Sequence, residues 1–249
     1  MKIKAFLAVI LACILGLTMA LFSGCDGGDN VLVMGTEPGF KPYEYKDGTE
    51  IMGVDVDIAN EIAKALGKTL KIEESDFDGV LLSVQQGKID FAAAGISVTE
   101  ERKQVMDFSI EYAVSKNVII VLDNNDTIKS GYDITTETIV GVQEANTAQY
   151  FLEDEMEIKP KTYQKFLQAA EDLKNGKIDC IVMDSLPAAE MVAVNPNFKI
   201  LEEELFTDTF AIAVKKGNTE LLNKINEVIQ KLIDEGKIDQ FTLNHTTKD

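Results

Sequence analysis

The chain has 249 residues, with 24 lysine or arginine and 42 aspartate or glutamate side chains, so its formal net charge at pH 7 is −18. A chain this acidic repels phosphate backbones and anionic lipid headgroups, which excludes nucleic acid as a partner. The single histidine, His245, falls in a polar stretch over 244–249 that we expect to fray. The sequence therefore cannot supply a Ser-His-Asp triad or a histidine-based metal site, and we expect no metal, no cofactor and no catalytic residue.

The N-terminus predicts export and a lipid anchor. Two lysines precede an uncharged, largely apolar run over 5–22, and small residues then lead into Cys25. This order is typical of a signal peptide, here over 1–24. The cysteine resembles the acylation site of bacterial lipoproteins, which carries palmitate, although Phe22 stands where those proteins usually have leucine. The alternative is an uncleaved transmembrane helix, since the run is near the length that spans a bilayer.

Cleavage before Cys25 leaves 225 residues with 22 basic and 42 acidic side chains, a net charge of −20. Residues 25–30 then form a short flexible tether. Cys180 stands in an apolar run, so we interpret it as a buried core residue and expect no disulfide. The protein is expected outside the cytoplasm, anchored to the cell membrane by lipidated Cys25.

Apolar runs and helical periodicities alternate along the mature chain. The patterns predict strands over 31–35, 70–73, 89–94, 117–122, 180–183 and 210–214, and helices over 57–66, 77–86, 185–192 and 220–234. Gly87 follows the second of these helices directly and is typical of a helix end. This alternation of strands and helices indicates an α/β fold with a mostly parallel sheet.

A repeated supersecondary unit indicates two lobes. The strings QGKID at 86–90 and NGKID at 175–179 each join the end of a helix to an apolar strand. Polar residues follow both strands, at 95–97 in one case and at Asp184 in the other. Ligands in open α/β sheets bind beyond the carboxyl ends of the strands, so two facing lobes would place these residues on opposite walls of one cleft.

The repeat also suggests where the lobes divide. We assign 31–115 together with 213–249 to the first lobe, which is discontinuous, and 116–212 to the second. The predicted strands at 117–122 and 210–214 lie where the chain leaves and re-enters the first lobe. They are therefore candidate hinge strands.

Arg102 and its neighbours form the first candidate site. Thr99 suits the N-cap of a helix, which places Arg102 in the first helical turn. The helix dipole disfavours a cation in the first turn. A bound anion such as a carboxylate would offset this repulsion between the Arg102 charge and the helix dipole, and the Ser97 hydroxyl lies close by in the sequence. The alternative is a surface arginine paired with Glu100 or Glu101.

Two further elements carry candidate ligand contacts. Phe40 and Tyr43 stand in a Pro/Gly-rich loop, and together with Phe77 they could cover the apolar part of a ligand, although ordinary loop packing explains Tyr43 and Phe77 equally well. Glu37 could accept a hydrogen bond from the ligand. Asp184 lies beyond an apolar strand, where it would bind a cation or, alternatively, only cap the following helix.

In these residues the sequence resembles the bacterial extracellular solute-binding proteins of family 3, the polar amino-acid receptors of ABC importers. The resemblance runs from about 31 to 244. Its most specific parts are TEPGFKPY at 36–43, GVDVDIA at 53–59, SVTEER at 97–102 continuing into MDFS at 106–109, and Asp184 at a strand end. It implies a two-lobed, type II periplasmic-binding-protein fold that closes around its ligand.

The resemblance also implies a role for each candidate residue. Arg102 matches the arginine that grips the α-carboxylate, and Asp184 matches the acid that binds the α-ammonium. The remaining implied ligand-binding residues are Glu37, Phe40, Phe77, Gly95, Ser97 and Thr147. The chain departs from the family at 145–147, where Ala-Asn-Thr replaces a loop that usually begins with glycine.

The expected function follows from these roles. The resemblance implies the substrate-binding component of an ABC importer, a monomer that captures a free amino acid and delivers it to a membrane permease. Glu37 favours a polar ligand side chain, cationic or amide. The alternatives are a dehydratase-type enzyme of the same fold, in which Glu37 would serve as acid or base, and an amino-acid sensor domain.

Overall fold

The computed structural model describes residues 30–247. The predicted signal peptide, Cys25 and all of the tether except Asn30 lie outside the described residues. Within 30–247, no helix combines the length and apolar character needed to cross a membrane.

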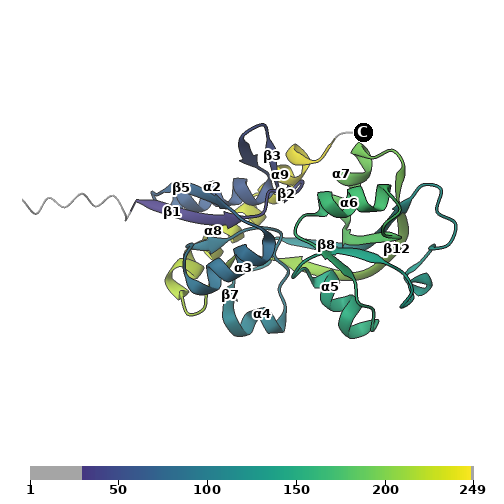
Figure 1. Cartoon of the computed structure of the whole chain (residues 1–249). Helices are drawn as coiled ribbons and strands as arrows, with labels where there is room; N and C mark the ends of the chain where they lie inside the picture. The colour runs from purple at the N-terminus through teal and green to yellow at the C-terminus, as the bar shows by residue number, and fades with distance from the viewer. Residues whose placement is uncertain (1–29, 248–249) are drawn as a thin grey trace, which may run out of the picture. The chain divides into compact units, whose positions relative to one another are not determined.

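The first of two five-stranded sheets is built from both ends of the described chain. Strand β1 is parallel to β6, and β13 is antiparallel to both β6 and β7. The strand order is β5 (Thr69–Glu74), β1 (Val31–Thr36), β6 (Phe91–Ala92), β13 (Ala213–Lys215) and β7 (Met106–Phe108). Around this sheet lie α2 (Val54–Ala65), α3 (Phe77–Gln86), α4 (Glu100–Val105), α8 (Thr219–Asp234) and α9 (Lys237–His245) (Figure 1).

The second sheet comes from the middle of the chain. Strand β9 is parallel to β10 and β11, whereas β8 is antiparallel to β11 and β12. The strand order is β10 (Lys161–Tyr163), β9 (Val140–Gln143), β11 (Cys180–Asp184), β8 (Ala113–Leu122) and β12 (Phe198–Phe210). Its helical elements are η1 (Gly131–Asp133), α5 (Thr147–Tyr150), η2 (Phe151–Glu155), α6 (Phe166–Lys174) and α7 (Ser185–Val194) (Figure 1).

A small antiparallel sheet occupies the segment that follows β1. It consists of β2 (Gly39–Phe40), β3 (Glu44–Asp47) and β4 (Glu50–Met52). The expected loop at 36–43 therefore includes one short strand.

The chain crosses between the two large sheets twice, and the crossings lie side by side. Ser109 N donates to the Ile212 carbonyl at 2.9 Å, and Tyr112 N donates to the Phe210 carbonyl at 2.9 Å. The prediction of one continuous strand over 210–214 is wrong. The strand breaks after Phe210 because the Ala211 amide donates to the Ile96 carbonyl at 3.1 Å and the Ile212 amide to the Ser109 hydroxyl at 2.9 Å.

Several local predictions are confirmed. Gly87 ends α3 in the left-handed conformation with φ of 70°, as its position after the helix predicted. Thr99 caps α4 by accepting a hydrogen bond from Arg102 N at 3.2 Å. Cys180 is fully buried in β11.

The expectation that the segment containing His245 frays is wrong for His245 itself. His245 is the last residue of α9, and its ring lies between two partners on other elements. Nδ1 is 3.0 Å from the Tyr45 hydroxyl and Nε2 is 2.9 Å from Asp57 Oδ2. The sequence 244–249 looks uniformly polar, but the helix that precedes it carries His245 onto β3 and α2.

Candidate functional site

All eight ligand-binding residues predicted from the sequence are buried. They lie where strands of the two large sheets end and where the following helices begin. The chain around the first sheet supplies Glu37, Phe77, Gly95, Ser97 and Arg102, β2 of the small sheet supplies Phe40, and the elements of the second sheet supply Thr147 and Asp184. A set of polar side chains buried together in this way requires either mutual hydrogen bonds or a ligand.

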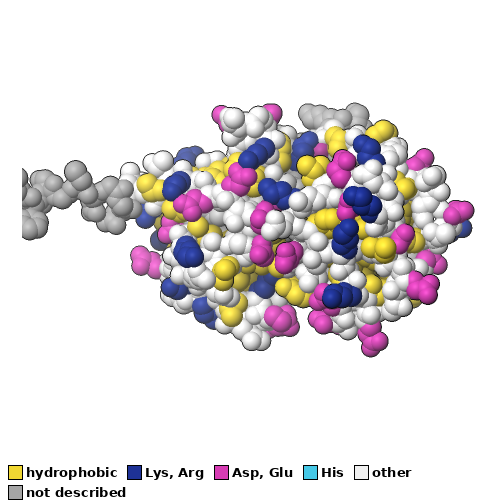
Figure 2. Space-filling model, viewed as in Figure 1, with side chains coloured by type: hydrophobic (Ala, Val, Ile, Leu, Met, Phe, Trp, Pro, Cys, Tyr) yellow, Lys and Arg dark blue, Asp and Glu magenta, His cyan; other side chains and the backbone are white. Residues whose placement is uncertain are grey.

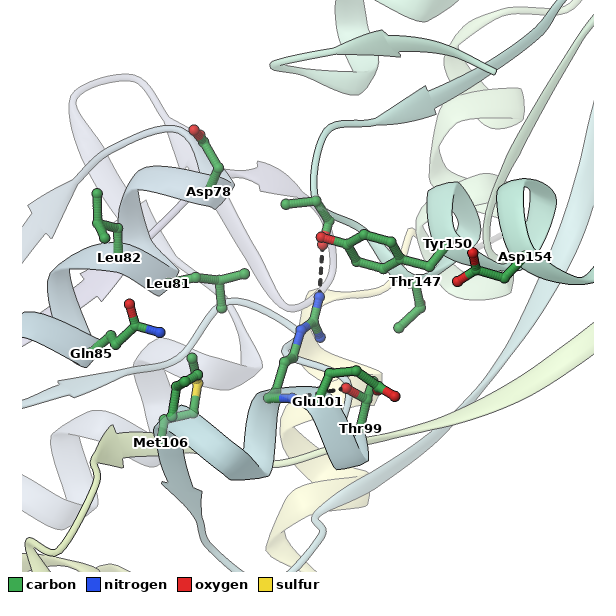
Figure 3. Close-up of a pocket in the computed structure, with 13 residues that line it drawn as sticks. Asp78, Leu81, Leu82, Gln85, Thr99, Glu101, Met106, Thr147, Tyr150 and Asp154 are labelled. Carbon is green, nitrogen blue, oxygen red and sulfur yellow. Dashed lines mark hydrogen bonds between the residues drawn. The ribbon is translucent and has the colours of Figure 1, made fainter. Parts of the chain in front are cut away.

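Arg102 forms hydrogen bonds to residues that follow a strand of each large sheet, β6 of the first and β9 of the second. Its guanidinium donates through Nη1 to the Ser97 carbonyl at 2.6 Å and through Nη2 to the Ala145 carbonyl at 2.8 Å (dashed line in Figure 3). The Phe77 ring centroid is 5.5 Å from Cζ, within cation–π range. Burial lowers the pKa of Arg102, but an arginine in a protein keeps its charge.

The alternative reading of Arg102 as a surface arginine is wrong. Arg102 is only 8% exposed. Glu100 pairs with Lys103 instead, at 2.8 Å. The short helix α4 thus directs Arg102 inward and Lys103 outward, which leaves a buried cation able to bind an anion.

Asp184 is the most deeply buried of the candidate carboxylates. It ends β11, is 1% exposed, and its Oδ1 accepts no hydrogen bond from the described part of the chain. The pKa of Asp184 is raised to about 7, mainly by burial and in part by the nearby Asp208 carboxylate, while the Arg102 charge opposes the shift. A buried carboxylate with free acceptor capacity is suited to bind a cationic group.

Glu37 faces the second sheet. Gln143 Nε2 donates to its Oε2 at 3.2 Å, and Lys165 Nζ lies 3.8 Å from its Oε1. Oε1 accepts no hydrogen bond from residues 30–247. Burial raises the pKa of Glu37, although Gln143 and Lys165 partly offset this effect.

The two predicted aromatic residues have different neighbours. Phe40 stacks on Phe166 of α6 with centroids 5.9 Å apart, whereas Phe77 lies against Arg102. Gly95 allows Phe40 to approach, because a Cβ at this position, where φ is +53°, would come within 2.8 Å of the Phe40 ring. Tyr43 is packed in the core, as the alternative of ordinary loop packing predicts, and its ring centroid lies 5.0 Å from that of Phe210 in an edge-to-face arrangement.

The sequence reasoning missed Asp208, which lies on β12 shortly before the chain returns to the first sheet. Its Oδ2 accepts hydrogen bonds from Ser97 Oγ at 3.1 Å, Asn117 Nδ2 at 3.1 Å and Thr147 Oγ1 at 2.6 Å. The two hydroxyl oxygens, Ser97 Oγ and Thr147 Oγ1, are themselves 3.4 Å apart. The only local signal was an acid beside an apolar segment, which is common and not specific.

A buried pair of carboxyl groups, Glu44 and Asp55, was also missed. Asp55 accepts hydrogen bonds from Gly95 N at 2.9 Å and from the Tyr112 hydroxyl at 2.6 Å. Burial raises the pKa of Asp55 to about 6, and burial together with the Asp55 charge raises the pKa of Glu44 well above its usual range. Asp55 fixes the start of the 95–97 segment through its bond from Gly95 N.

A cavity of 540 Å³ lies beside Arg102. Figure 3 shows its lining from three directions, with Asp78, Leu81, Leu82 and Gln85 on α3, Thr99 and Glu101 at α4, and Thr147, Tyr150 and Asp154 at α5 and η2. Of the predicted residues, Arg102 and Thr147 line this cavity and the other six do not.

On the face shown in Figure 2, acidic and basic side chains are intermixed, with apolar side chains between them. No cluster of three or more metal-ligating side chains occurs among residues 30–247.

The two five-stranded sheets and the paired crossings between them define a two-lobed, type II periplasmic-binding-protein fold. The chain belongs to the bacterial extracellular solute-binding proteins, family 3, whose family model matches residues 32–247. The members and neighbours found are substrate-binding transport proteins, not enzymes.

Three similar proteins illustrate the ligands within this family. A protein named "Probable histidine-binding protein" from Campylobacter jejuni is 32% identical, over 96% of this chain and 95% of its own length. The substrate-binding protein AbpA of an amino acid ABC transporter from Streptococcus pneumoniae, solved with L-arginine, is 32% identical with a TM-score of 0.82, over 86% of this chain and 94% of that one. An ancestral arginine-binding protein solved with glutamine is 38% identical with a TM-score of 0.79, over 85% and 96%.

Proposed function

We propose that this protein is the extracytoplasmic substrate-binding component of an ABC importer and that it captures a free amino acid with a cationic or amide side chain. The observation that carries the proposal is the burial of Arg102 and Asp184 at the ends of elements from opposite sheets. One buried cation and one buried anion with free acceptor capacity match the charge order of an α-amino acid.

The proposed binding mode assigns each end of the ligand to one of these groups. The α-carboxylate accepts from Arg102, with help from Ser97 and Thr147, and the α-ammonium donates to Asp184. Each charge-assisted hydrogen bond contributes about 1.5–3 kcal/mol. Four or five of them can reach micromolar affinity, about −8 kcal/mol, after the cost of ordering the site.

Glu37 supports a cationic or amide ligand side chain. It is a second buried carboxylate with an oxygen that accepts no hydrogen bond from residues 30–247, and Phe40 packs nearby at the end of β2. The similar proteins are named for histidine or solved with arginine or glutamine, and all three ligands carry a hydrogen-bond donor on the side chain. L-Arginine is the first candidate because a guanidinium would also compensate the charge of Glu37.

Lobe closure is the proposed mechanism of capture. With lobes at 31–115 plus 213–249 and at 116–212, the paired crossings near Ser109 and Ile212 act as the hinge. A ligand that bridges Arg102 and Asp184 favours the closed form, which a membrane permease then recognises. We further propose that the protein works as a monomer attached to the cell membrane through lipidated Cys25, as the lipoprotein-like leader suggests.

The test is a thermal-shift screen of the standard amino acids, followed by calorimetry on Arg102→Met. We expect L-arginine, L-histidine or L-glutamine to raise the unfolding temperature of the wild type, since a ligand that binds only the folded state stabilises it. Arg102→Met should weaken binding by more than about 100-fold, because truncating one partner of a buried charge pair costs several kcal/mol.

Lys103→Met is the matched control. Lys103 is the neighbouring cation on α4, but it is exposed and pairs with Glu100 at 2.8 Å. The Lys103→Met variant should therefore bind the amino acid with unchanged affinity. Full affinity in Arg102→Met would exclude the proposed carboxylate site.

A further inference from the structure

Asp208 competes for the same hydrogen-bond donors that a bound amino acid would use. Its Oδ2 accepts from Ser97 Oγ and Thr147 Oγ1, which come from elements of opposite sheets, and from Asn117 Nδ2 on the first hinge strand, β8. Asp208 itself lies on the second hinge strand, β12, where it is paired in register with Ser115. One carboxylate oxygen thus ties together both walls of the proposed cleft and both hinge strands.

A hydroxyl group has a single proton, and this limits what Ser97 and Thr147 can do. A hydroxyl that donates to Asp208 presents only lone pairs to any other group. Lone pairs repel a ligand carboxylate and therefore cannot stabilise it. The two hydroxyls can bind the α-carboxylate as donors only when they turn away from Asp208.

Electrostatics adds to this competition. Arg102 is attracted by both Asp208 and Asp184, so Asp208 serves as one of the counter-charges of the buried guanidinium. A ligand carboxylate that binds Arg102 brings a second negative charge close to Asp208. Like charges at short range raise the free energy of the complex.

We propose that Asp208 is an internal competitor for the α-carboxylate site, which sets the ligand affinity by holding the hydroxyl protons of Ser97 and Thr147. This inference rests on the proposed function. Binding of an amino acid transfers both hydrogen bonds from Asp208 Oδ2 to the ligand carboxylate, while Asp208 retains its bond from Asn117. Asp208 thus keeps the affinity below what Arg102 and the two hydroxyls could otherwise provide.

The test compares Asp208→Asn with the wild type, using L-arginine and L-argininamide, which lacks the α-carboxylate, as probes in calorimetry. Asparagine keeps the shape of the side chain and an oxygen for Asn117, but it removes the charge that competes with the ligand. We expect the Kd for L-arginine to fall about 10-fold, since a neutral amide oxygen holds the two hydroxyl protons more weakly than a carboxylate does and no longer repels the ligand carboxylate. The Kd for L-argininamide should not fall.

Glu204→Gln is the control for loss of a negative charge on the same strand, because Glu204 is exposed and pairs with Lys116. It should change neither Kd. A weaker affinity for L-arginine in Asp208→Asn, an unchanged affinity, or an equal gain for both probes would overturn the inference. If Asp208→Asn does not fold, Asp208→Ser is scored by the same criteria.

The outcome for the wild type separates this inference from the proposed function. A wild-type protein that binds neither L-arginine nor any other standard amino acid overturns both. A wild-type protein that binds another amino acid moves the same comparison to that amino acid and its carboxamide. Normal binding by the wild type with no gain in Asp208→Asn overturns only the role of Asp208.

Discussion

Burying a carboxylate without a full set of hydrogen bonds costs the folded state free energy, and Asp184 illustrates this cost. The folded state raises the pKa of Asp184 from 3.8 to about 7, with desolvation as the main cause. The folded chain therefore binds a proton more tightly than the unfolded chain between these pH values. The contribution of Asp184 to stability decreases as the pH rises from about 4 to 7 and is constant above.

Asp184→Asn should therefore stabilise the protein at neutral and alkaline pH while it abolishes binding of the ligand ammonium. We expect the free energy of unfolding to rise by about 2–4 kcal/mol at pH 8. The gain should shrink toward pH 4, because Asp184 is then protonated in the folded state and no longer carries a buried charge. Urea denaturation at pH 4.5, 6 and 8 measures this, with exposed Asp126→Asn as the control that shows no such trend. Equal stability of Asp184→Asn and the wild type at pH 8 would contradict the prediction.

At the residue scale, sequence reasoning located the residues at the ends of local elements. The positions of Arg102 and Asp184 follow from a helix start and a strand end, which short patterns reveal. Asp208 and the pair of Glu44 and Asp55 were not found, because their partners are 40 or more residues away along the chain. No local sequence pattern indicates which side chains come into contact when they are this far apart along the chain.

Among the elements, the loop between β9 and α5 carries backbone strain. Ala145 has φ of +62°, in the left-handed region that favours glycine. The strain has a structural consequence. This conformation directs the Ala145 carbonyl to Arg102 Nη2 and the Ala145 amide to Gln149 Oε1 at 2.9 Å.

Ala145→Gly should stabilise the protein by about 0.5–1 kcal/mol. Glycine removes the steric penalty of about 1–2 kcal/mol in the left-handed conformation, and the greater freedom of the unfolded chain offsets part of the gain. Ala189→Gly, at an exposed position within α7, should have the opposite effect and cost about 1 kcal/mol. Denaturant titration of both variants gives the comparison, and a destabilised Ala145→Gly would contradict the prediction.

Helices were easier to predict than the ends of strands. The periodicities over 77–86 and 220–234 correspond closely to α3 and α8, and Gly87 marked a helix end correctly. The break between β12 and β13 was missed because it depends on hydrogen bonds from Ala211 and Ile212 to distant residues. An apolar β-branched run looks the same whether it stays in one sheet or passes to another.

Across the whole molecule, a second set of contacts joins elements of the two sheets. Glu190 on α7 is buried and pairs with Lys41 Nζ at 2.8 Å. It also accepts hydrogen bonds from the Thr247 amide, at 2.6 Å, and from the Thr247 hydroxyl. In the proposed division, Lys41 and Thr247 belong to one lobe and Glu190 to the other, so these contacts favour the closed form.

Glu190→Ala should weaken amino-acid binding about 3- to 10-fold, because the closed form loses a partly buried ion pair and its hydrogen bonds. Calorimetry measures the affinity, and hydrogen exchange at the end of α9 should become faster. Glu227→Ala removes an exposed ion pair within the single helix α8 and should change neither quantity. A Glu190→Ala protein with wild-type affinity would show that these contacts do not contribute to closure.

The two-lobed organisation was predicted from the repeated unit at 86–90 and 175–179, together with the family resemblance. The contacts of Glu190 could not be predicted in the same way, because Lys41 and Thr247 lie at opposite ends of the described chain. The structured end of α9 was likewise hidden, since His245 depends on Tyr45 and Asp57 for its position.

The burial of Cys180 makes the protein a convenient scaffold for an optical amino-acid reporter. Burial raises the pKa of its thiol to about 12, so at neutral pH it reacts hardly at all with maleimide dyes. A chain expressed without residues 1–25 has no other cysteine. Cysteines introduced at Asp78 and Asp154, both exposed on the rim of the same cavity, can then carry a donor and an acceptor dye whose energy transfer reports binding directly.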